Sequence, residues 1–280
     1  MDRNKKQIIN LSIFAFVVIF SGWAGVILNN IMGERQNEGS LGSGLWLISA
    51  CLAGIIIRIV NRDWKDFGVL PHFKDNLKWY LFAILVYPVI TLIVTGLGLV
   101  TGTCSVSEFD INKLTPIFLS SLVGIFIIKI FEEYSWRGFL TPKLIELNLK
   151  DWQIYVLVGI IWTLWHGAYY LVLLPDNTFE GTSRLGMFLS GFIIMGIWGV
   201  MYTEVYRLTK SVLPCLIMHV VEDELFMILP SQKAISFNNI GKIFFDLNSG
   251  IVTVVLFLMI GLILRQVRIK KEIAQTRSHY

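Results

Sequence analysis

Residues 78–102 read KWYLFAILVYPVITLIVTGLGLVTG, and Lys78 is the only charged residue among them. About 20 predominantly apolar residues are enough for an α-helix to cross the hydrocarbon core of a bilayer. Similar blocks cover nearly the whole chain of 280 residues, which is 55% hydrophobic and 16% charged, with a mean hydropathy of +0.65. This composition excludes an ordinary water-soluble domain and predicts an integral membrane protein.

The other apolar blocks complete the predicted fold. Backbone groups in hydrocarbon must be paired within their own segment, so each block is expected to be an α-helix. We predict an all-α, polytopic transmembrane helix bundle that forms a single integral membrane domain over residues 1–280, because no polar stretch is long enough to fold separately. The approximate spans are 8–32, 41–60, 78–102, 114–137, 152–174, 185–207, 211–229 and 249–267.

The cysteines and the net charge exclude several kinds of site. Cys51, Cys104 and Cys215 are an odd number with no Cys-x-x-Cys spacing, which excludes a disulfide framework and a cysteine zinc site. The net charge of +4 comes without a long basic tract or a nucleic-acid-binding motif, so no nucleic-acid partner is expected.

Lys and Arg are distributed unevenly between alternate connections. With eight spans, 18 of the 24 basic residues fall on the side that holds both termini and 5 fall on the other, while Lys129 lies inside a span. Cationic segments cross membranes less readily than neutral ones. We therefore predict that both termini are cytoplasmic, in what we expect to be a bacterial cell membrane, with membrane lipid as the surrounding partner.

Ionisable residues inside the spans indicate where a functional site lies. A charge at bilayer depth costs on the order of 3 kcal/mol or more, so such residues usually face a polar cavity. They occur on the fourth, fifth and seventh spans and are Lys129, Glu132, Glu133, Arg137, His166, His219, Glu222, Asp223 and Glu224.

On the fourth span, helix geometry gives two adjacent carboxylates different neighbours. At about 100° per residue, Arg137 lies about 40° from Glu133 but about 140° from Glu132. Arg137 is therefore expected to pair with Glu133. Glu132 has only Lys129 on its own face and is expected to point into the bundle as a base or a ligand. The alternative, taken for this helix alone, is an ordinary charged helix end at the inner membrane surface.

The fifth and seventh spans supply two of the four histidines of the chain. Trp162 precedes His166 by one helical turn, so the two residues share a face. His219 and Asp223 also share a face, about 40° apart. A lone histidine in an apolar helix is more often an imidazole that hydrogen-bonds a neighbouring helix than a catalytic residue. Together with the carboxylates, the two histidines predict one polar site formed by three helices.

These residues, in this order, resemble the CPBP family of intramembrane endopeptidases, which includes the CAAX prenyl proteases and the bacterial Abi or bacteriocin-processing proteins. The family pattern is Glu-Glu-x-x-x-Arg, then an aromatic residue four positions before a histidine (aromatic-x-x-x-His), then His-x-x-x-Asn or Asp. Here the three parts read Glu132-Glu133-Tyr-Ser-Trp-Arg137, Trp162-Thr-Leu-Trp-His166 and His219-Val-Val-Glu-Asp223. The resemblance covers about residues 115–228. Trp162 replaces the commoner phenylalanine, and Asp223 stands where asparagine is frequent.

The resemblance implies hydrolysis of a peptide bond by an activated water. Glu132 would be the general base, and His166 would hold and polarise the water. Glu133 and Arg137 would fix the helix end, and His219 with Asp223 would stabilise the oxyanion. An ionised aspartate cannot donate a hydrogen bond, so Asp223 would have to be protonated, accept from His219 or bind a metal.

The metal version of this mechanism uses the same residues as ligands. Glu132, His166, His219 and possibly Asp223 would then bind Zn²⁺, with water completing the shell. The sequence has no His-Glu-x-x-His and no Gly-x-Ser-x-Gly, which excludes a conventional zincin and a serine nucleophile of the hydrolase type. We favour the metal-free mechanism, in which no cofactor is needed, because the ligands are not closely spaced.

The expected substrate is a membrane-associated peptide or protein, either a prenylated CAAX protein or a precursor peptide. Two other functions use the same residues. A non-catalytic membrane scaffold or immunity protein would keep the bundle, but it would tolerate apolar residues at Glu132, His166 and His219. A proton-coupled transporter would use them as a relay, but such transporters often contain two similar halves, and this sequence shows no repeat.

Overall fold

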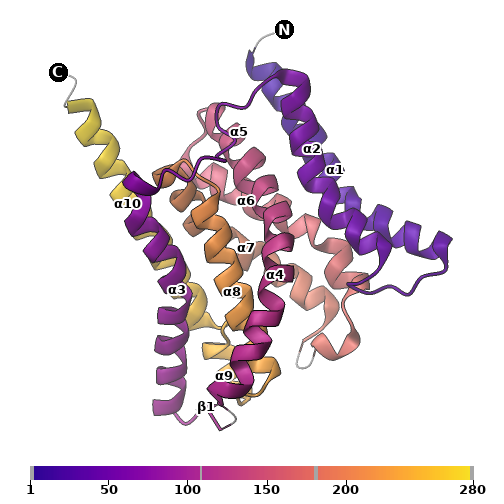
Figure 1. The fold of residues 1–280 in the computed structure, drawn as a ribbon, viewed down its shortest axis with the longest axis vertical. Helices are drawn as coiled ribbons and strands as arrows, with labels where there is room; N and C mark the ends of the chain where they lie inside the picture. The colour runs from indigo at the N-terminus through magenta and orange to yellow at the C-terminus, as the bar shows by residue number, and fades with distance from the viewer. Residues whose placement is uncertain (1–2, 108, 180–181, 278–280) are drawn as a thin grey trace. The chain divides into compact units, whose positions relative to one another are not determined.

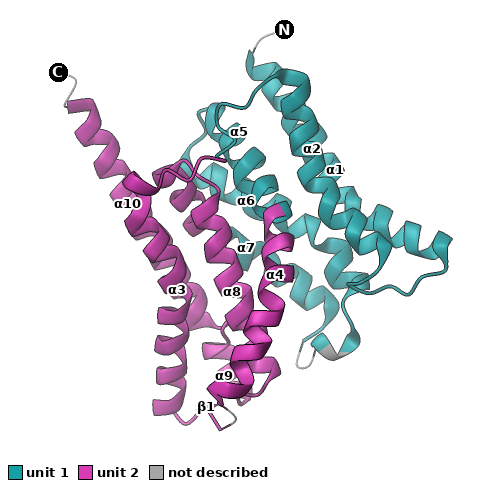
Figure 2. Ribbon diagram, in the orientation of Figure 1, with its two compact units in different colours: residues 1–68, 131–199 teal, residues 69–130, 200–280 magenta. Residues whose placement is uncertain are grey.

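The computed structural model of the protein describes residues 3–107, 109–179 and 182–277 (Figure 1). Long α-helices account for most of these residues, which confirms the predicted all-α membrane bundle. By their internal contacts the residues form two units, 1–68 with 131–199 and 69–130 with 200–280 (Figure 2). The interpretation of the chain as a single membrane domain stays a prediction.

The first unit begins with a tightly packed helical pair. It contains α1 (Arg3–Met32), α2 (Leu41–Asn61), the π-helical turn η1 (Trp136–Leu140), α5 (Thr141–Glu146), α6 (Asp151–Trp165), the π-helical turn η2 (Tyr169–Leu173), the 3₁₀ turn η3 (Asp176–Phe179) and the first part of α7 (Arg184–Thr209). The side chain of Ser40 caps α2 by accepting from the Ser43 amide. Trp46 of α2 stacks on Trp165 of α6, with ring centroids 4.2 Å apart, and donates to the Trp165 carbonyl at 2.9 Å. This contact fixes the end of α6.

The second unit consists of helices joined at one end by a short strand pair. It contains α3 (Phe73–Val100), most of α4 (Ile111–Ser135), the end of α7, α8 (Leu213–Ser231), α9 (Asn239–Phe245) and α10 (Ile251–Arg277). The two-residue strands β1 (Cys104–Ser105) and β2 (Ser236–Phe237) pair antiparallel and are the only strands in the described part of the chain. The rings of Tyr87, Phe226 and Phe257 meet edge to face between α3, α8 and α10. This unit holds the segment with His219.

All eight predicted spans coincide with helices. Within the described residues, seven helices are long and apolar enough to cross a membrane. The eighth, α8, has 19 residues but carries three acidic residues, Glu222, Asp223 and Glu224. The chain is an integral membrane protein on this evidence.

Two of the predicted spans are not continuous α-helices. The α-helical part of the fourth span ends at Ser135 and continues as the π-helical turn η1, and that of the fifth ends at Trp165, with His166 as the C-cap and η2 beyond it. A π-turn holds one more residue per turn than an α-turn, so it rotates the side chains that follow. The first π-turn contains the motif residue Arg137, and the second follows the motif residue His166 by three positions. Single π-turns in α-helices are frequent at functional sites.

Candidate active site

Glu133 and Arg137 form a fully buried ion pair inside the first unit. Glu133 lies in the last turn of α4, and Arg137 lies within η1. Arg137 Nη1 donates to Glu133 Oε1 at 3.0 Å, and neither side chain is exposed. The Arg137 guanidinium also lies 4.9 Å from the ring centroid of Trp162, a cation–π distance. The pairing expected from helix geometry is therefore present, and it connects two of the three motif segments.

Glu132 is also buried, with 5% of its surface exposed. Lys129, which helix geometry offered to Glu132, forms an ion pair with Asp223 of α8, with Nζ 2.8 Å from Oδ2. The sequence did not predict this pair, because it joins two different helices. The Glu132 carboxylate is thus shielded from bulk solvent.

His166 closes the last turn of α6. Its Nδ1 lies 3.0 Å from the Trp162 carbonyl oxygen, and its ring stacks on Tyr170 at 5.4 Å. A carbonyl only accepts hydrogen bonds, so Nδ1 carries the proton and the lone pair of the neutral ring lies on Nε2. This tautomer suits a histidine that accepts a proton from water or binds a metal through Nε2.

In the second unit, α8 gathers three possible ligands. Nitrogen or oxygen atoms of His219, Glu222 and Asp223 all lie within 4.8 Å of one another, and His219 and Glu222 are both only 2% exposed. Tyr202 places its ring edge-on to His219 at 5.5 Å, and its hydroxyl donates to Glu222 at 3.0 Å. Tyr87 in turn donates to the Tyr202 hydroxyl at 3.2 Å. A hydrogen-bonded chain therefore holds the Glu222 carboxylate beside His219.

The ion pair with Lys129 bears on the chemistry of Asp223. A carboxylate that pairs with an ammonium group accepts hydrogen bonds from it and does not donate one to an oxyanion. Histidine and carboxylate groups are suitable Zn²⁺ ligands. A cation bound by His219, Glu222 and Asp223 would, however, have to displace Lys129 from Asp223. The donor types fit a metal, but the present charge arrangement does not favour one.

Buried charged residues also lie outside the predicted site, among them Glu204, Arg268 and Arg58. Glu204 on α7 is fully buried, and its carboxylate pairs with Arg268 of α10, whose Nη2 donates at 3.2 Å. A glutamate inside an apolar span was a visible signal for this pair. Arg58 of α2, with 1% exposure, donates to the Gly138 carbonyl of η1. A single arginine near a span end is not distinguishable in sequence from an interfacial charge.

Comparison with known proteins supports the motif assignment. Residues 114–224 match the family model described as "Type II CAAX prenyl endopeptidase Rce1-like". The matched segment begins in α4 and ends in α8, so it contains all three motif parts. No curated protein matches the chain in a sequence search. The resemblance to the CAAX protease family that the motifs predicted is therefore confirmed over this segment.

Proposed function

We propose that this protein, whose residues 114–224 match the CAAX-type endopeptidase family, cleaves a peptide bond of a membrane-associated substrate by means of a water activated by Glu132. The observation that carries the proposal is the buried Glu132 directly beside the fully buried Glu133–Arg137 pair, in the family's Glu-Glu-x-x-x-Arg segment. A buried carboxylate of this kind can take a proton from a water molecule held beside it.

The remaining residues receive roles that suit their surroundings. His166, with Nδ1 directed to the Trp162 carbonyl, polarises the water through Nε2. Glu133 and Arg137 fix the end of α4, so that Glu132 is held in one orientation. His219 donates to the oxyanion, a type of contact that typically contributes about 3 to 4 kcal/mol of transition-state stabilisation. Asp223, whose carboxylate lies within 4.8 Å of a His219 ring nitrogen, orients the imidazole.

A zinc-dependent mechanism is the alternative to this metal-free one. Zn²⁺ held by Glu132, His166, His219 or Asp223 would supply Lewis-acid activation of the water. We favour the metal-free version because Lys129 already neutralises Asp223. Metal analysis of the purified protein, with a chelator titration, tests this choice: stoichiometric zinc whose removal abolishes cleavage and whose return restores it would establish the metal version.

We propose a prenylated CAAX-type protein or a precursor peptide as the substrate, reached from the cytoplasmic leaflet of a bacterial membrane. Both have a peptide segment held at the membrane surface by an apolar group. The lipid anchor would bring the scissile bond to the depth of a buried carboxylate, which a freely soluble peptide would not reach.

The experiment that tests the function is peptide cleavage by the purified protein in liposomes. Farnesylated and unprenylated forms of one CAAX peptide, together with membrane peptides that accumulate in cells carrying Glu132→Gln, are followed by mass spectrometry. We expect cleavage by the wild type, at least 100-fold slower cleavage by Glu132→Gln, and unchanged cleavage by Glu272→Gln, a control at an exposed carboxylate. Equal rates for Glu132→Gln and the wild type would remove Glu132 from the mechanism.

A further inference from the structure

The π-helical turn η1 contains a backbone carbonyl that the helix cannot satisfy in the usual way. In an α-helix, the Gly138 carbonyl would accept from the amide of residue 142. Residue 142 is a proline and has no amide hydrogen. Arg137, the partner of Glu133, lies within this same turn. The conformation of the turn therefore determines where the guanidinium of Arg137 points.

Arg58 of α2 supplies the missing donors. Its Nε and Nη2 both donate to the Gly138 carbonyl oxygen, at 2.9 and 2.5 Å. Its Nη1 donates to the Asp63 carbonyl and to Asp66 Oδ1, both at 2.7 Å. All three nitrogens of a side chain with 1% exposure are thus occupied. One arginine connects the end of α2, the loop that follows it and the motif turn.

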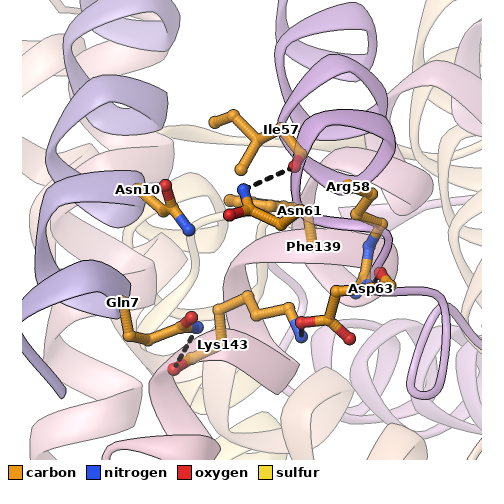
Figure 3. Close-up of a pocket in the computed structure, with 8 residues that line it drawn as sticks. All are labelled: Gln7, Asn10, Ile57, Arg58, Asn61, Asp63, Phe139 and Lys143. Carbon is orange, nitrogen blue, oxygen red and sulfur yellow. Dashed lines mark hydrogen bonds and ion pairs between the residues drawn. The ribbon is translucent and has the colours of Figure 1, made fainter. Parts of the chain in front are cut away.

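Surrounding groups hold Arg58 in this position. Figure 3 shows Arg58 beside Phe139 and Asp63, on the wall of a small pocket that has room for about one water molecule, about 10 Å³. The guanidinium carbon lies 5.6 Å from the Phe139 ring centroid. Lys143 of α5 pairs with Asp63 at 2.8 Å and with Asp66 at 3.0 Å. The carboxylates that neutralise Arg58 are themselves fixed to the segment that follows η1.

Gly138 is so closely surrounded that a side chain at this position would crowd its neighbours. A Cβ atom at Gly138 would lie 3.0 Å from Tyr134 Cδ1 and 3.3 Å from Phe67 Cε2, closer than ordinary contacts. Phe67 in turn lies 5.3 Å from the Arg58 guanidinium carbon. The turn, the loop and Arg58 are therefore packed against one another on both sides of the carbonyl.

We infer that Arg58 is a positioning residue for the proposed peptidase: by holding the Gly138 carbonyl it fixes η1, and through η1 it fixes the Glu133–Arg137 pair beside Glu132. This inference rests on the proposed function for its effect on catalysis, but its effect on the turn is independent of it. Burial of an arginine is costly without such bonds, so a charge that only anchored α2 at the interface would be expected to remain in water.

The test uses Arg58→Lys and Arg58→Gln in the full-length protein, each with a matched control at the exposed Arg62, Arg62→Lys and Arg62→Gln. Lysine keeps the charge but offers a single donor group in place of the planar fork. Two properties are measured per folded protein: amide hydrogen exchange of peptides that cover residues 136–146, and kcat and KM for peptide cleavage. Arg58→Lys covers the case in which Arg58→Gln fails to fold.

We expect both Arg58 variants to speed exchange in residues 136–146 and to lower kcat at least tenfold, with KM within twofold and Arg58→Lys less affected than Arg58→Gln. The Arg62 variants are expected to behave as the wild type. Unchanged exchange, or faster exchange with an unchanged kcat, overturns the inference. If the wild type cleaves no peptide, the proposed function fails, while faster exchange in the Arg58 variants still supports the hold on the turn.

Discussion

The side chains of Glu133 and Arg137 are both fully buried, with 3.0 Å between the paired atoms. Two charges taken out of water stabilise a fold only through each other and their further hydrogen bonds. Removal of one partner leaves the other as a buried charge, whereas removal of both leaves apolar groups of similar size. A comparison of single and double substitutions can therefore separate the effect of this pair on stability from its effect on activity.

We predict that Arg137→Met lowers the free energy of unfolding by roughly 3–5 kcal/mol and that Glu133→Met/Arg137→Met recovers part of this loss. Peptide cleavage is expected to be lost in both variants, because the pair also orients the end of α4. Thermal unfolding in detergent and cleavage by the same preparations provide the two measurements. An unfolding temperature of Arg137→Met equal to that of the wild type would show that the pair is not a buried charge pair in solution.

At this scale the sequence predicts contacts within one helix and misses those between segments. The Glu133–Arg137 pair follows from 100° per residue. Arg58 and Gly138, or Lys129 and Asp223, are far apart in the chain, and helix periodicity contains no information about which helices adjoin. Pro142 was the one local signal for Arg58, because a proline four residues after Gly138 removes the donor that its carbonyl needs.

Among the elements, α1 and α2 show how closely two helices of this protein approach. A Cβ atom at Gly42 would meet the Gly25 carbonyl oxygen, and one at Gly25 would meet that of Gly42. Small residues at membrane helix contacts permit such approach and increase the packing energy. Gly44, also on α2, has nothing within 4 Å of its Cβ position, so it serves as a matched control.

We predict that Gly42→Ala destabilises the protein by about 1–3 kcal/mol, because a methyl group there forces the two backbones apart. Gly44→Ala is expected to be neutral or to stabilise by up to about 1 kcal/mol, since alanine favours the helix over glycine. Unfolding temperatures in detergent distinguish the two sites. Equal effects of the two substitutions would contradict the close α1–α2 contact.

The loop after α2 is fixed to α5 in a pH-dependent way. Burial of the Asp63 carboxyl alone would raise its pKa, but the hydrogen bond and charge of Lys143, with a smaller contribution from Arg58, lower the pKa below its ordinary value of 3.8. A carboxyl whose pKa is lowered in the folded state stabilises the fold above its unfolded pKa, and this contribution is lost as pH falls through the folded pKa.

Asp63→Asn is therefore expected to unfold at a lower temperature than the wild type at pH 7. The difference should shrink below about pH 4, near the pKa of an unfolded aspartate, and disappear at lower pH. Melting curves of both proteins between pH 7 and pH 3 measure this. A difference that stays constant over this range would exclude the Asp63–Lys143 ion pair as its cause.

Hydropathy predicted the spans well because each one is an apolar block bounded by charges. It did not predict the π-helical turns at Trp136–Leu140 and Tyr169–Leu173, since a hydrophobic period does not determine which amide a carbonyl bonds. The strands Cys104–Ser105 and Ser236–Phe237 are too short to give an alternating pattern. The family motif remained readable despite these interruptions because its residue spacings are kept in the chain.

For the whole molecule, α8 determines the topology. In the part of the chain that the structure describes, seven helices are long and apolar enough to cross a membrane, and α8 is long enough but carries three acidic residues. Eight crossings put both termini on one side, as the distribution of Lys and Arg indicates, whereas seven crossings put them on opposite sides.

We predict that both termini are cytoplasmic. Fusions of green fluorescent protein and alkaline phosphatase to each end report the side, because the first folds in the cytoplasm and the second is active only outside it. Fluorescence without phosphatase activity at both ends is expected. Phosphatase activity at one end alone would show an odd number of crossings and would exclude α8 as a span.

In the proposed mechanism, Glu132 and His219 act in one chemical step. The most direct measurement is a double-mutant cycle on kcat/KM for peptide cleavage, with Glu132→Gln, His219→Ala and the two combined. When two residues act in the same step, the effects of their substitutions on kcat/KM are strongly non-additive. We predict that the double variant is within about tenfold of the slower single variant. If the fold-losses of the two single variants multiply in the double variant, or if either single variant cleaves at the wild-type rate, the two residues do not act in one step.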